Sequence, residues 1–448
     1  MFLSLNWLRE YVDIPNNISV PDLTSLLNLH VVEVDNVINQ ENQFKNIVVG
    51  KILSIEEHPN ADKLKKAVVN VGKEKLEIVC GAPNIKKGQL VPVALIGAIM
   101  PDGMEIKETL IRGEKSFGML CSQRELKLGD DHSGILILDD SAKVGQLISD
   151  FLELNDCIFE IDNKSLTNRP DLWGYLGMAR EIAIITKGKL KDVSVKDLTI
   201  EAKAPINVSV LSAENCPRYM ALQIDNIKIE DSPWWLKKKL ITSGLKPINN
   251  IVDITNYIML ETAQPMHAFN ADSIMVGDIE KEIKIIVRMA EPGESIQSLD
   301  GEKRELSEMD IVIANRDELL AVAGVMGGAK SQITNSTKSI ILESANFNPI
   351  AVRKTSKKLG LRTESSIRFE KGLDPSMAEI ALNRAVNLLA SLDKEARIVA
   401  SADVKNYAQQ LSVIKLELAW LQKRLGDLIT FERVKEILEA LGFGVKSL

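Results

Sequence analysis

The chain has 448 residues, of which 45% are hydrophobic and 26% are charged, and its formal net charge is -7. This composition is typical of a globular protein, and no run approaches the roughly 20 apolar residues that a membrane helix needs. A prior of about 150 residues per domain predicts roughly three domains. The negative total argues against a surface coated in basic residues, although nucleic-acid binding also depends on local patches.

The N-terminus and the cysteines indicate the cellular setting. Arg9, Glu10 and Asp13 come too early for a signal peptide. The cysteines include no C-x-x-C pair, which argues against a zinc ribbon or a disulfide framework. They are Cys80, Cys121, Cys157 and Cys216. We therefore expect a cytoplasmic protein without a membrane partner and without a metal site in this chain.

The predicted secondary structure changes from helix to short strands near residue 41. Residues 1–40 predict one short helix that begins at Pro21. Residues 47–148 carry short β-rich runs between turn clusters such as HPNAD and GAPN. The runs are IVVGKILSI, KAVVNV, KLEIVC, LVPVALI and SGILIL. Their spacing predicts a small closed barrel over residues 41–151, for which the five-stranded oligonucleotide-binding (OB) barrel is one option.

Helical periodicity returns at 171–188, and the polar stretch 187–203 predicts a linker. An α+β region follows, in which IKIIVRM, DIVIAN and SIILES are expected strands. Its three helices are marked by cap residues and by proline near the first turn. They run from Ser232-Pro233 to Gly244, from Asn348-Pro349 to Gly360, and onward from Asp374-Pro375. The apolar residues of a last helix, 430–442, have nothing after them to pack against, so we expect a chain cut inside a domain.

One stretch, Lys246 to Phe269, has many polar side chains among apolar residues. Burying an amide or hydroxyl without a partner costs a few kcal/mol, so these groups are expected to bond one another or a polar ligand. They are Asn249, Asn250, Asp253, Thr255, Asn256, Gln264 and His267. The stretch therefore predicts a binding site.

Five phrases occur in order in the barrel segment: HPNADKL, IVCGAPN, the turn from Gly97 to Pro101, SFGMLCS and LGDDHSG. Together they resemble the tRNA-binding barrel shared by synthetase appendages and free tRNA-binding proteins. Lys63 and Lys65, near one turn, are candidates for RNA contact, and a solvated turn is the alternative. The histidines and cysteines here match no zinc spacing, so structure or RNA contact is the better interpretation of His58.

A wider resemblance covers nearly the whole chain. SLNWLREYVD, NRPDLWGYLGMAREIA, CPRYMA, KPINNIVDITNYIMLETAQPMHAF, AGVMGG and GLRTESSIRFEKGLDP occur in order. This succession resembles the β subunit of bacterial phenylalanyl-tRNA synthetase, N-terminal part. The resemblance implies a multidomain α+β protein with the OB barrel inserted in a small α/β domain. The implied domains are 1–40 with 152–200, the barrel at 41–151, a B3/B4-type editing domain at 205–400, and the start of a helical, winged-helix-like B5 domain at 405–448.

The resemblance also implies a function and partners. The family's α subunit carries the aminoacylation site, while the β subunit binds tRNA(Phe) and hydrolyses mischarged Tyr-tRNA(Phe), within an α2β2 heterotetramer. ATP and Mg2+ are expected for the complete synthetase, with no cofactor in this chain, which has no G-x-x-x-x-G-K-[ST] phosphate loop. The alternatives are a non-enzymatic tRNA-binding module and a scaffold for a partner subunit.

Four candidate catalytic residues follow from the resemblance. Glu343 matches the glutamate that accepts the tyrosine hydroxyl, and a strand-end salt bridge is the alternative. His267 matches the editing-site histidine, which orients water or the terminal adenosine, and a core histidine is its alternative. Thr255 and Asn256 would line the site and bind the substrate.

Six further positions are candidates for substrate or tRNA binding. Lys246 stands where arginine is common in the family. The lysine would make a single-point contact where an arginine could make a bidentate one. Gly324 and Gly327 suit a tight turn, for ligand approach or for a simple bend. Arg362 belongs to a cluster of seven basic residues between 353 and 371, which could hold the tRNA acceptor end near Thr363 and Ser365; a solvated helix face is the alternative.

Overall fold

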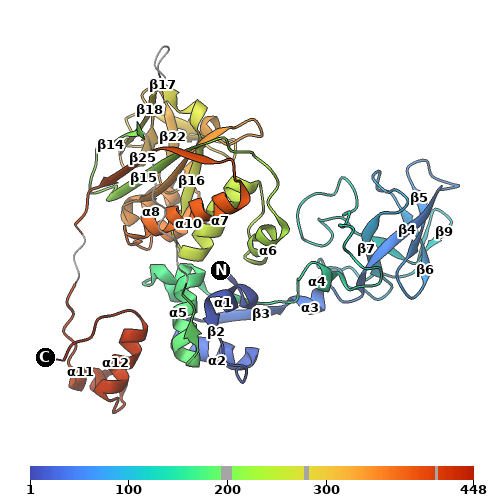
Figure 1. Ribbon diagram of the computed structural model, residues 1–448, viewed down its shortest axis with the longest axis horizontal. Helices are drawn as coiled ribbons and strands as arrows, with labels where there is room; N and C mark the ends of the chain where they lie inside the picture. The colour runs from blue at the N-terminus through green and yellow to red at the C-terminus, as the bar shows by residue number, and fades with distance from the viewer. Residues whose placement is uncertain (193–203, 277–281, 409–411, 448) are drawn as a thin grey trace.

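The computed structural model describes residues 1–192, 204–276, 282–408 and 412–447. Figure 1 shows the strands of the barrel to one side of the molecule, and the α+β region reaches the barrel segment through Trp234, which packs against the barrel core, and through the ion pair of Lys246 with Asp130. In these described ranges no helix combines the length and apolar character needed to span a bilayer. Residues 193–203 of the predicted linker lie outside the described residues.

The N-terminal domain is built from two stretches that are distant in the sequence. Its three-stranded sheet has the order β1-β11-β3, and β11 pairs antiparallel with both neighbours, so the chain after the barrel returns to the sheet that it left. The first stretch holds β1 (Phe2–Ser4), α1 (Leu5–Tyr11), β2 (Val12–Asp13), α2 (Val20–His30) and β3 (Val34–Asn39). The second holds β11 (Cys157–Ile161), η1 (Asn163–Leu166), η2 (Pro170–Trp173), α5 (Tyr175–Thr186) and β12 (Lys189–Leu190).

The prediction of a single helix in residues 1–40 was wrong, because α1 precedes α2. The Ser4 hydroxyl accepts a hydrogen bond from the Trp7 amide and caps α1. Seven residues are too few for a clear helical period in the sequence, although Trp7, Leu8 and Tyr11 are all buried.

The barrel is a five-stranded sheet in the order β10-β7-β4-β5-β6. The Phe117 amide donates to Glu77 O and the Val79 amide to the Ser116 hydroxyl, which brings β6 close to the β9–β10 segment and nearly closes the sheet. The elements are α3 (Gln40–Gln43), β4 (Ile47–Glu57), β5 (Lys65–Asn70), β6 (Lys75–Cys80), β7 (Leu90–Leu95), β8 (Thr109–Ile111), β9 (Glu114–Ser116), β10 (Gly118–Leu120) and α4 (Ile148–Phe151).

The expected strand SGILIL at 133–138 was wrong. This run makes isolated backbone hydrogen bonds, from Leu136 N to Cys121 O and from Leu138 N to Leu90 O, instead of a ladder. Its apolar residues Ile135 and Leu138 are buried under the barrel, which accounts for the strand-like pattern. The fifth strand is the short β10 instead.

The α+β region contains two main sheets. One has the order β13-β25-β15-β24-β16, and the other has the order β14-β18-β21-β22-β23 with β17 paired to β18. The strands are β13 (Ala204–Pro205), β14 (Asn207–Val210), β15 (Arg218–Asp225), β16 (Met266–Asn270), β17 (Met275–Val276), β18 (Glu282–Met289), β19 (Ser295–Gln297), β20 (Lys303–Glu305), β21 (Ile311–Ala314), β22 (Leu319–Val322), β23 (Met326–Gly327), β24 (Ser339–Asn346) and β25 (Arg397–Lys405).

Side-chain caps begin α7, α8 and α9, whereas α6 and α10 begin without one. Asn348 caps α8 through its side-chain oxygen, and Gly360 ends it at a φ of 66°. The helices are α6 (Trp234–Thr242), α7 (Asn250–Thr262), η3 (Ala271–Ser273), η4 (Ala329–Ser331), α8 (Pro349–Leu359), α9 (Glu364–Phe369) and α10 (Met377–Leu392). All three helices predicted from cap signals are therefore present as α6, α8 and α10.

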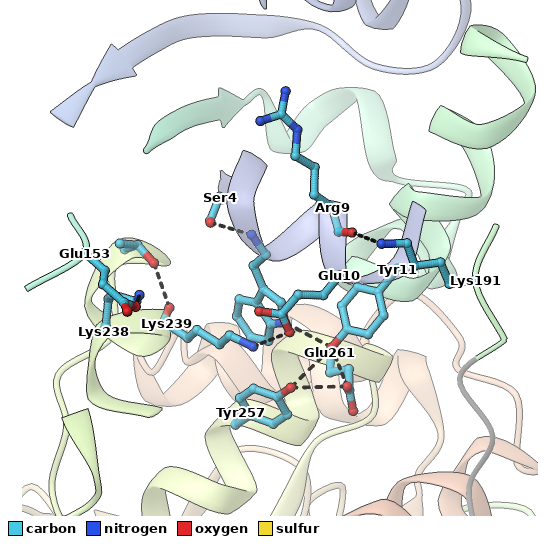
Figure 2. Close-up of polar contacts among 12 residues, drawn as sticks. Ser4, Arg9, Glu10, Tyr11, Glu153, Lys191, Lys238, Lys239, Tyr257 and Glu261 are labelled. Atoms are coloured by element: carbon cyan, nitrogen blue, oxygen red, sulfur yellow. Dashed lines mark hydrogen bonds and ion pairs between the residues drawn. The ribbon is translucent and has the colours of Figure 1, made fainter. Parts of the chain in front are cut away.

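The N-terminal domain packs directly on the α+β region. Figure 2 shows the Tyr11 hydroxyl pointing at the Glu261 carboxylate and at Tyr257 of α7, and Tyr11 donates to Glu261. Trp7 stacks on Tyr257 with ring centroids 4.9 Å apart. The Lys239 ammonium lies 2.5 Å from the Glu10 carboxylate. One continuous cluster of buried side chains runs through both parts, so the expected boundary near residue 205 stays a prediction.

The two C-terminal helices are α11 (Leu418–Leu425) and α12 (Phe431–Ala440). The apolar face of α12 was expected to find nothing after it in the chain to pack against, and the contact that it makes is with the earlier helix α5. Val434 is buried, and Ile437 lines a groove that α12 shares with α5. Other apolar side chains of this segment stay exposed, with Trp420 at 52% and Leu428 at 84% of their surface.

Candidate functional site

A cavity of 480 Å³ lies in the α+β region, bounded by α7, β16, β22–β23, β24 and α9. Its volume falls in the range of small-molecule sites. The lining joins apolar side chains with a few polar ones, as such sites usually do. Among the polar lining residues are Asn249, Thr255, Asn256, His267, Gln332, Glu343, Thr363, Glu364 and Ser365.

His267 and Glu343 are neighbours on one wall of this cavity. The pairing of β16 with β24 makes them Cα partners, so both side chains leave the sheet on the same face. Glu343 is buried, and burial raises its pKa to about 7, while a hydrogen bond from the Tyr219 hydroxyl (2.8 Å) lowers it. Burial lowers the pKa of His267 to about 4, so its imidazole is neutral at physiological pH.

Helix α7 presents one face to the cavity. Val252, Thr255, Asn256 and Met259 line it, and their spacing of three and four residues places them on a single stripe. The helix begins at Asn249, whose side-chain oxygen accepts from the Ile251 and Val252 amides. The Thr255 hydroxyl donates to Val252 O within the helix, so its oxygen can act toward a ligand as an acceptor.

The other polar side chains of the 246–269 stretch hold neighbouring loops. Asn250 donates to Lys228 O, and the Asp253 carboxylate accepts from the Ser232 hydroxyl and the Ile248 amide. Gln264 donates to Ala345 O on β24. Some polar side chains of this stretch thus line the cavity, and the others form internal hydrogen bonds that hold neighbouring segments in place.

Glycines shape the wall opposite α7. Gly324 adopts a φ of 69°, in the left-handed region, and a Cβ there would lie 3.0 Å from Phe369 and from Val352. A Cβ on Gly327 would lie 2.7 Å from His267 Cε1. The absence of a side chain at Gly327 therefore leaves room for the imidazole.

Helix α9 brings Thr363 and Ser365 to the cavity. The Thr363 hydroxyl caps α9 by accepting from the Ser366 amide, and it donates to Val325 O. Thr363 thereby ties α9 to the segment between β22 and β23. Ser365 is half-buried at the cavity wall.

The remaining predicted binding residues lie outside this cavity. Lys246 is exposed, and its ammonium lies 2.5 Å from Asp130 of the barrel segment. Arg362 is exposed just before α9, while Lys63 and Lys65 lie at the β4–β5 connection of the barrel. The structure therefore brings together His267, Glu343, Thr255, Asn256, Gly324, Gly327, Thr363 and Ser365, and not these four.

The basic cluster between 353 and 371 is smaller at the surface than the sequence implies. Arg368 is fully buried, and it donates to Trp173 O of the N-terminal domain and to the Glu364 carboxylate. Lys371 pairs with Glu370 at 2.8 Å. The prediction of seven basic side chains on one tRNA-facing patch was wrong for Arg368.

Sequence reasoning missed three contributors to the site. Tyr219 lies behind Glu343, and Leu299 and Phe369 line the cavity. Tyr219 stands in the CPRYMA motif, but no local pattern relates it to Glu343, 124 residues away. Only the register of β15 against β24 brings the two together.

His58 has a structural role in the barrel. One ring nitrogen lies 3.1 Å from Ile111 O and the other accepts from the Asn60 amide. In the ranges that the structure describes, no group of three or more His, Cys, Asp or Glu is arranged to hold a metal ion.

Two sequence families match the chain. The family described as "Putative tRNA binding domain" matches residues 47–147, the barrel, and the family described as "B3/4 domain" matches residues 215–394, which include His267 and Glu343. Fold and sequence together define a multidomain α+β protein that joins a tRNA-binding, OB-like barrel to a B3/4 domain. The predicted fold class is confirmed.

The curated relatives share one name, "Phenylalanine--tRNA ligase beta subunit". The protein of Desulfotalea psychrophila is 44% identical over 410 residues, 91% of this chain and 49% of the relative. The protein of Clostridium acetobutylicum is 39% identical over 449 residues, which are 98% of this chain and 55% of the relative. The protein of Fusobacterium nucleatum is 40% identical over 453 residues, which are 100% of this chain and 55% of the relative. The resemblance to phenylalanyl-tRNA synthetase β subunits is confirmed. The chain spans about half the length of the curated relatives it matches.

Proposed function

We propose that this chain is the tRNA-binding and editing part of a phenylalanyl-tRNA synthetase β subunit, and that it hydrolyses mischarged Tyr-tRNA(Phe). One observation carries the proposal. Within the B3/4 match, His267 and Glu343 lie side by side on adjacent strands at the wall of a cavity of 480 Å³ that Thr255 and Asn256 also line. These are the four residues expected to act in catalysis.

Discrimination between tyrosine and phenylalanine explains why such a cavity is needed. The two amino acids differ by one hydroxyl, which a hydrophobic synthetic pocket rejects by only about 10². A hydrolytic site that hydrogen-bonds the hydroxyl works in the opposite sense, because bound phenylalanine leaves a buried polar group unpaired. Glu343, which is buried at the cavity wall, supplies such an acceptor.

Hydrolysis of the ester needs a positioned water molecule and little else from the protein. The ester bond of an aminoacyl-tRNA is already activated, so positioning and charge stabilisation suffice. His267 is neutral at physiological pH and can accept a proton from water or orient it. Asn256 offers an amide to the carbonyl or ribose of the substrate, and Thr255 offers a hydroxyl.

The same proposal covers the partners of the complete enzyme. The barrel would bind tRNA(Phe), with Lys63 and Lys65 as contacts, and Lys246 and Arg362 would meet the tRNA outside the cavity. An α subunit in an α2β2 heterotetramer would attach phenylalanine, using ATP and Mg2+ at its own site. We place the assembly in the cytoplasm. No step proposed for this chain passes through ATP or a metal ion.

The test is a deacylation assay on the purified chain. Tyr-tRNA(Phe) and Phe-tRNA(Phe), each carrying a labelled amino acid, are incubated separately with the protein and release is followed. We expect tyrosine to be released much faster than phenylalanine. Equal release, or none above the rate without protein, would contradict the editing role.

A tRNA-binding scaffold is the second candidate, favoured by the family match over residues 47–147. A scaffold would bind tRNA with unchanged affinity in both charging states and would release neither amino acid. Filter binding of uncharged tRNA(Phe) in parallel with the deacylation assay therefore separates the two candidates.

A further inference from the structure

Tyr219 lies directly behind the carboxylate that would read the substrate. Strand β15 is the neighbour of β24 on the side opposite β16, and Ala221 is the Cα partner of Glu343. Tyr219, two residues before Ala221, leaves the sheet on the same face and lies diagonally from Glu343, within reach of a long side chain. Its hydroxyl donates to Glu343 Oε2 at 2.8 Å.

Tyr219 does not take part in lining the cavity. Its side chain is fully buried, and the cavity is lined by Glu343 and His267 but not by Tyr219. A ligand in the cavity would therefore meet Glu343 and not Tyr219. Among the described residues, Tyr219 supplies the only side-chain hydrogen bond to the Glu343 carboxylate.

One occupied oxygen fixes the carboxylate and leaves the other for a ligand. A carboxylate accepts at about four lone-pair positions, and a single bond from a rigid, buried phenol removes much of its rotational freedom. An ionised carboxylate is an acceptor only, so it bonds a phenolic hydroxyl and penalises a bare phenyl ring. A neutral carboxyl group in free rotation would distinguish the two rings less well.

We propose that Tyr219 is a positioning residue that holds Glu343 as an oriented acceptor for the phenolic hydroxyl and thereby sets the preference for tyrosyl over phenylalanyl esters. This inference rests on the proposed editing function. It adds a specificity determinant that lies outside the cavity.

The charge state of Glu343 supports this geometry. The Tyr219 hydrogen bond opposes the effect of burial and lowers the pKa of Glu343. The other titratable groups around Glu343 are His267 on β16, Glu364 on α9 and the buried thiol of Cys216 before β15. His267 is neutral near pH 7, so among these groups the Tyr219 hydroxyl is the one that favours the ionised carboxylate.

The test compares Tyr219→Phe with the wild-type 448-residue chain. Loss of a buried hydrogen bond to a charged group corresponds to roughly tenfold in selectivity, so the ratio of tyrosine to phenylalanine release should fall about that far at pH 7. The Glu343 carboxyl titration, followed by the infrared band that Glu343→Gln removes, should move to higher pH.

Two further variants separate positioning from folding. Tyr175→Phe is a matched control, because Tyr175 is also buried and its hydroxyl bonds Ser4 and Ser243 of the N-terminal domain interface. It should leave both readouts unchanged. The double variant Tyr219→Phe/Glu343→Gln removes both partners, so it should fold and be no less selective than Glu343→Gln alone.

Each outcome decides one of the two proposals. If the wild-type chain releases tyrosine selectively and Tyr219→Phe keeps both the release ratio and the Glu343 titration, the role of Tyr219 is refuted and the editing function stands. Equal slowing of both esters with an unmoved titration also refutes it, since it indicates a structural role only. If the wild-type chain releases neither amino acid, the editing function fails, and the specificity role fails with it.

Discussion

His267 and Glu343 face each other on adjacent antiparallel strands, and burial moves their pKa values in opposite directions. The imidazole has a pKa of about 4 and the carboxyl group a pKa of about 7. Near neutral pH the pair therefore consists of a neutral base beside a carboxyl group that is partly ionised. Such a pair suits a site that positions water and reads a hydroxyl.

The opposite shifts predict a hidden pH dependence of stability. The lowered pKa of His267 makes its contribution rise with pH between about 4 and 6.5, because the unfolded chain binds more protons there. The raised pKa of Glu343 makes its contribution fall with pH between 4.5 and about 7. The two largely cancel in the wild type.

Single variants should reveal the separate contributions of Glu343 and His267 to the pH dependence of the free energy of unfolding. Relative to the wild type, the free energy of unfolding of Glu343→Gln should rise with pH from 4.5 to about 7, by on the order of 3 kcal/mol. Relative to the wild type, that of His267→Phe should fall with pH from about 4 to 6.5 by a similar amount. Urea unfolding at a series of pH values measures both, and parallel curves for all three proteins would contradict the assigned shifts.

We predict that release of tyrosine from Tyr-tRNA(Phe) is slowed about 10- to 100-fold by Glu343→Ala and at least about 100-fold by His267→Ala. A hydrogen bond to a charged group contributes about 1.5–3 kcal/mol, and a positioned general base gives at least about a hundredfold. Binding of uncharged tRNA should stay within about twofold, since the tRNA contacts lie mainly elsewhere. Unchanged hydrolysis in both variants would remove these residues from the site.

The sequence predicted much of the fold, because caps and hydrophobic alternation are local. Asn348, Pro349 and Gly360 mark α8 at both ends, and the strand runs from Ile47 to Leu95 correspond to β4–β7. The site residues came from the family resemblance. Their individual roles stay predictions, although the structure places eight of the twelve around one cavity.

What the sequence could not predict depends on contacts between distant strands and domains. The partnership of Tyr219 with Glu343 depends on strand register, which no local pattern encodes. Arg368 was expected on a basic surface, but its bonds to Trp173 and Glu364 bury it. The run at 133–138 resembles a strand because burial alone produces the same apolar pattern.

We predict that Gly327→Ala impairs editing with little loss of stability. The added Cβ would lie 2.7 Å from His267 Cε1, so the imidazole must move, and a movable side chain yields cheaply. Gly324→Ala is the contrasting variant. Its φ of 69° and its contacts with Phe369 and Val352 at 3.0 Å predict a loss of roughly 1–3 kcal/mol. Deacylation rates and thermal unfolding of both variants test the contrast.

Glu261→Gln should destabilise the chain strongly. Glu261 is fully buried, and it accepts from Tyr11 of the N-terminal domain and pairs with Arg384 of α10. Removing one member of a buried pair leaves the other charge uncompensated, at a cost of about 3–5 kcal/mol. Glu10→Gln is the control at the same interface, because Glu10 is half-exposed beside Lys239 and should cost at most about 1 kcal/mol. Similar unfolding midpoints for the two variants would show that the Glu261 network does not join the domains.

Lys63→Ala should weaken tRNA binding through the barrel. Lys63 is exposed at the β4–β5 connection, where its ammonium is free to approach a phosphate. Removing one phosphate-binding cation lowers the slope of log affinity against log salt concentration by roughly one. Lys107→Ala, on the same barrel, is the matched control, because the Lys107 ammonium is already paired with the Glu105 carboxylate at 2.7 Å and is not expected to contact a phosphate. Titrations of tRNA(Phe) at several salt concentrations should show a smaller slope for Lys63→Ala only, and equal slopes for the two variants would place the tRNA on another face of the barrel.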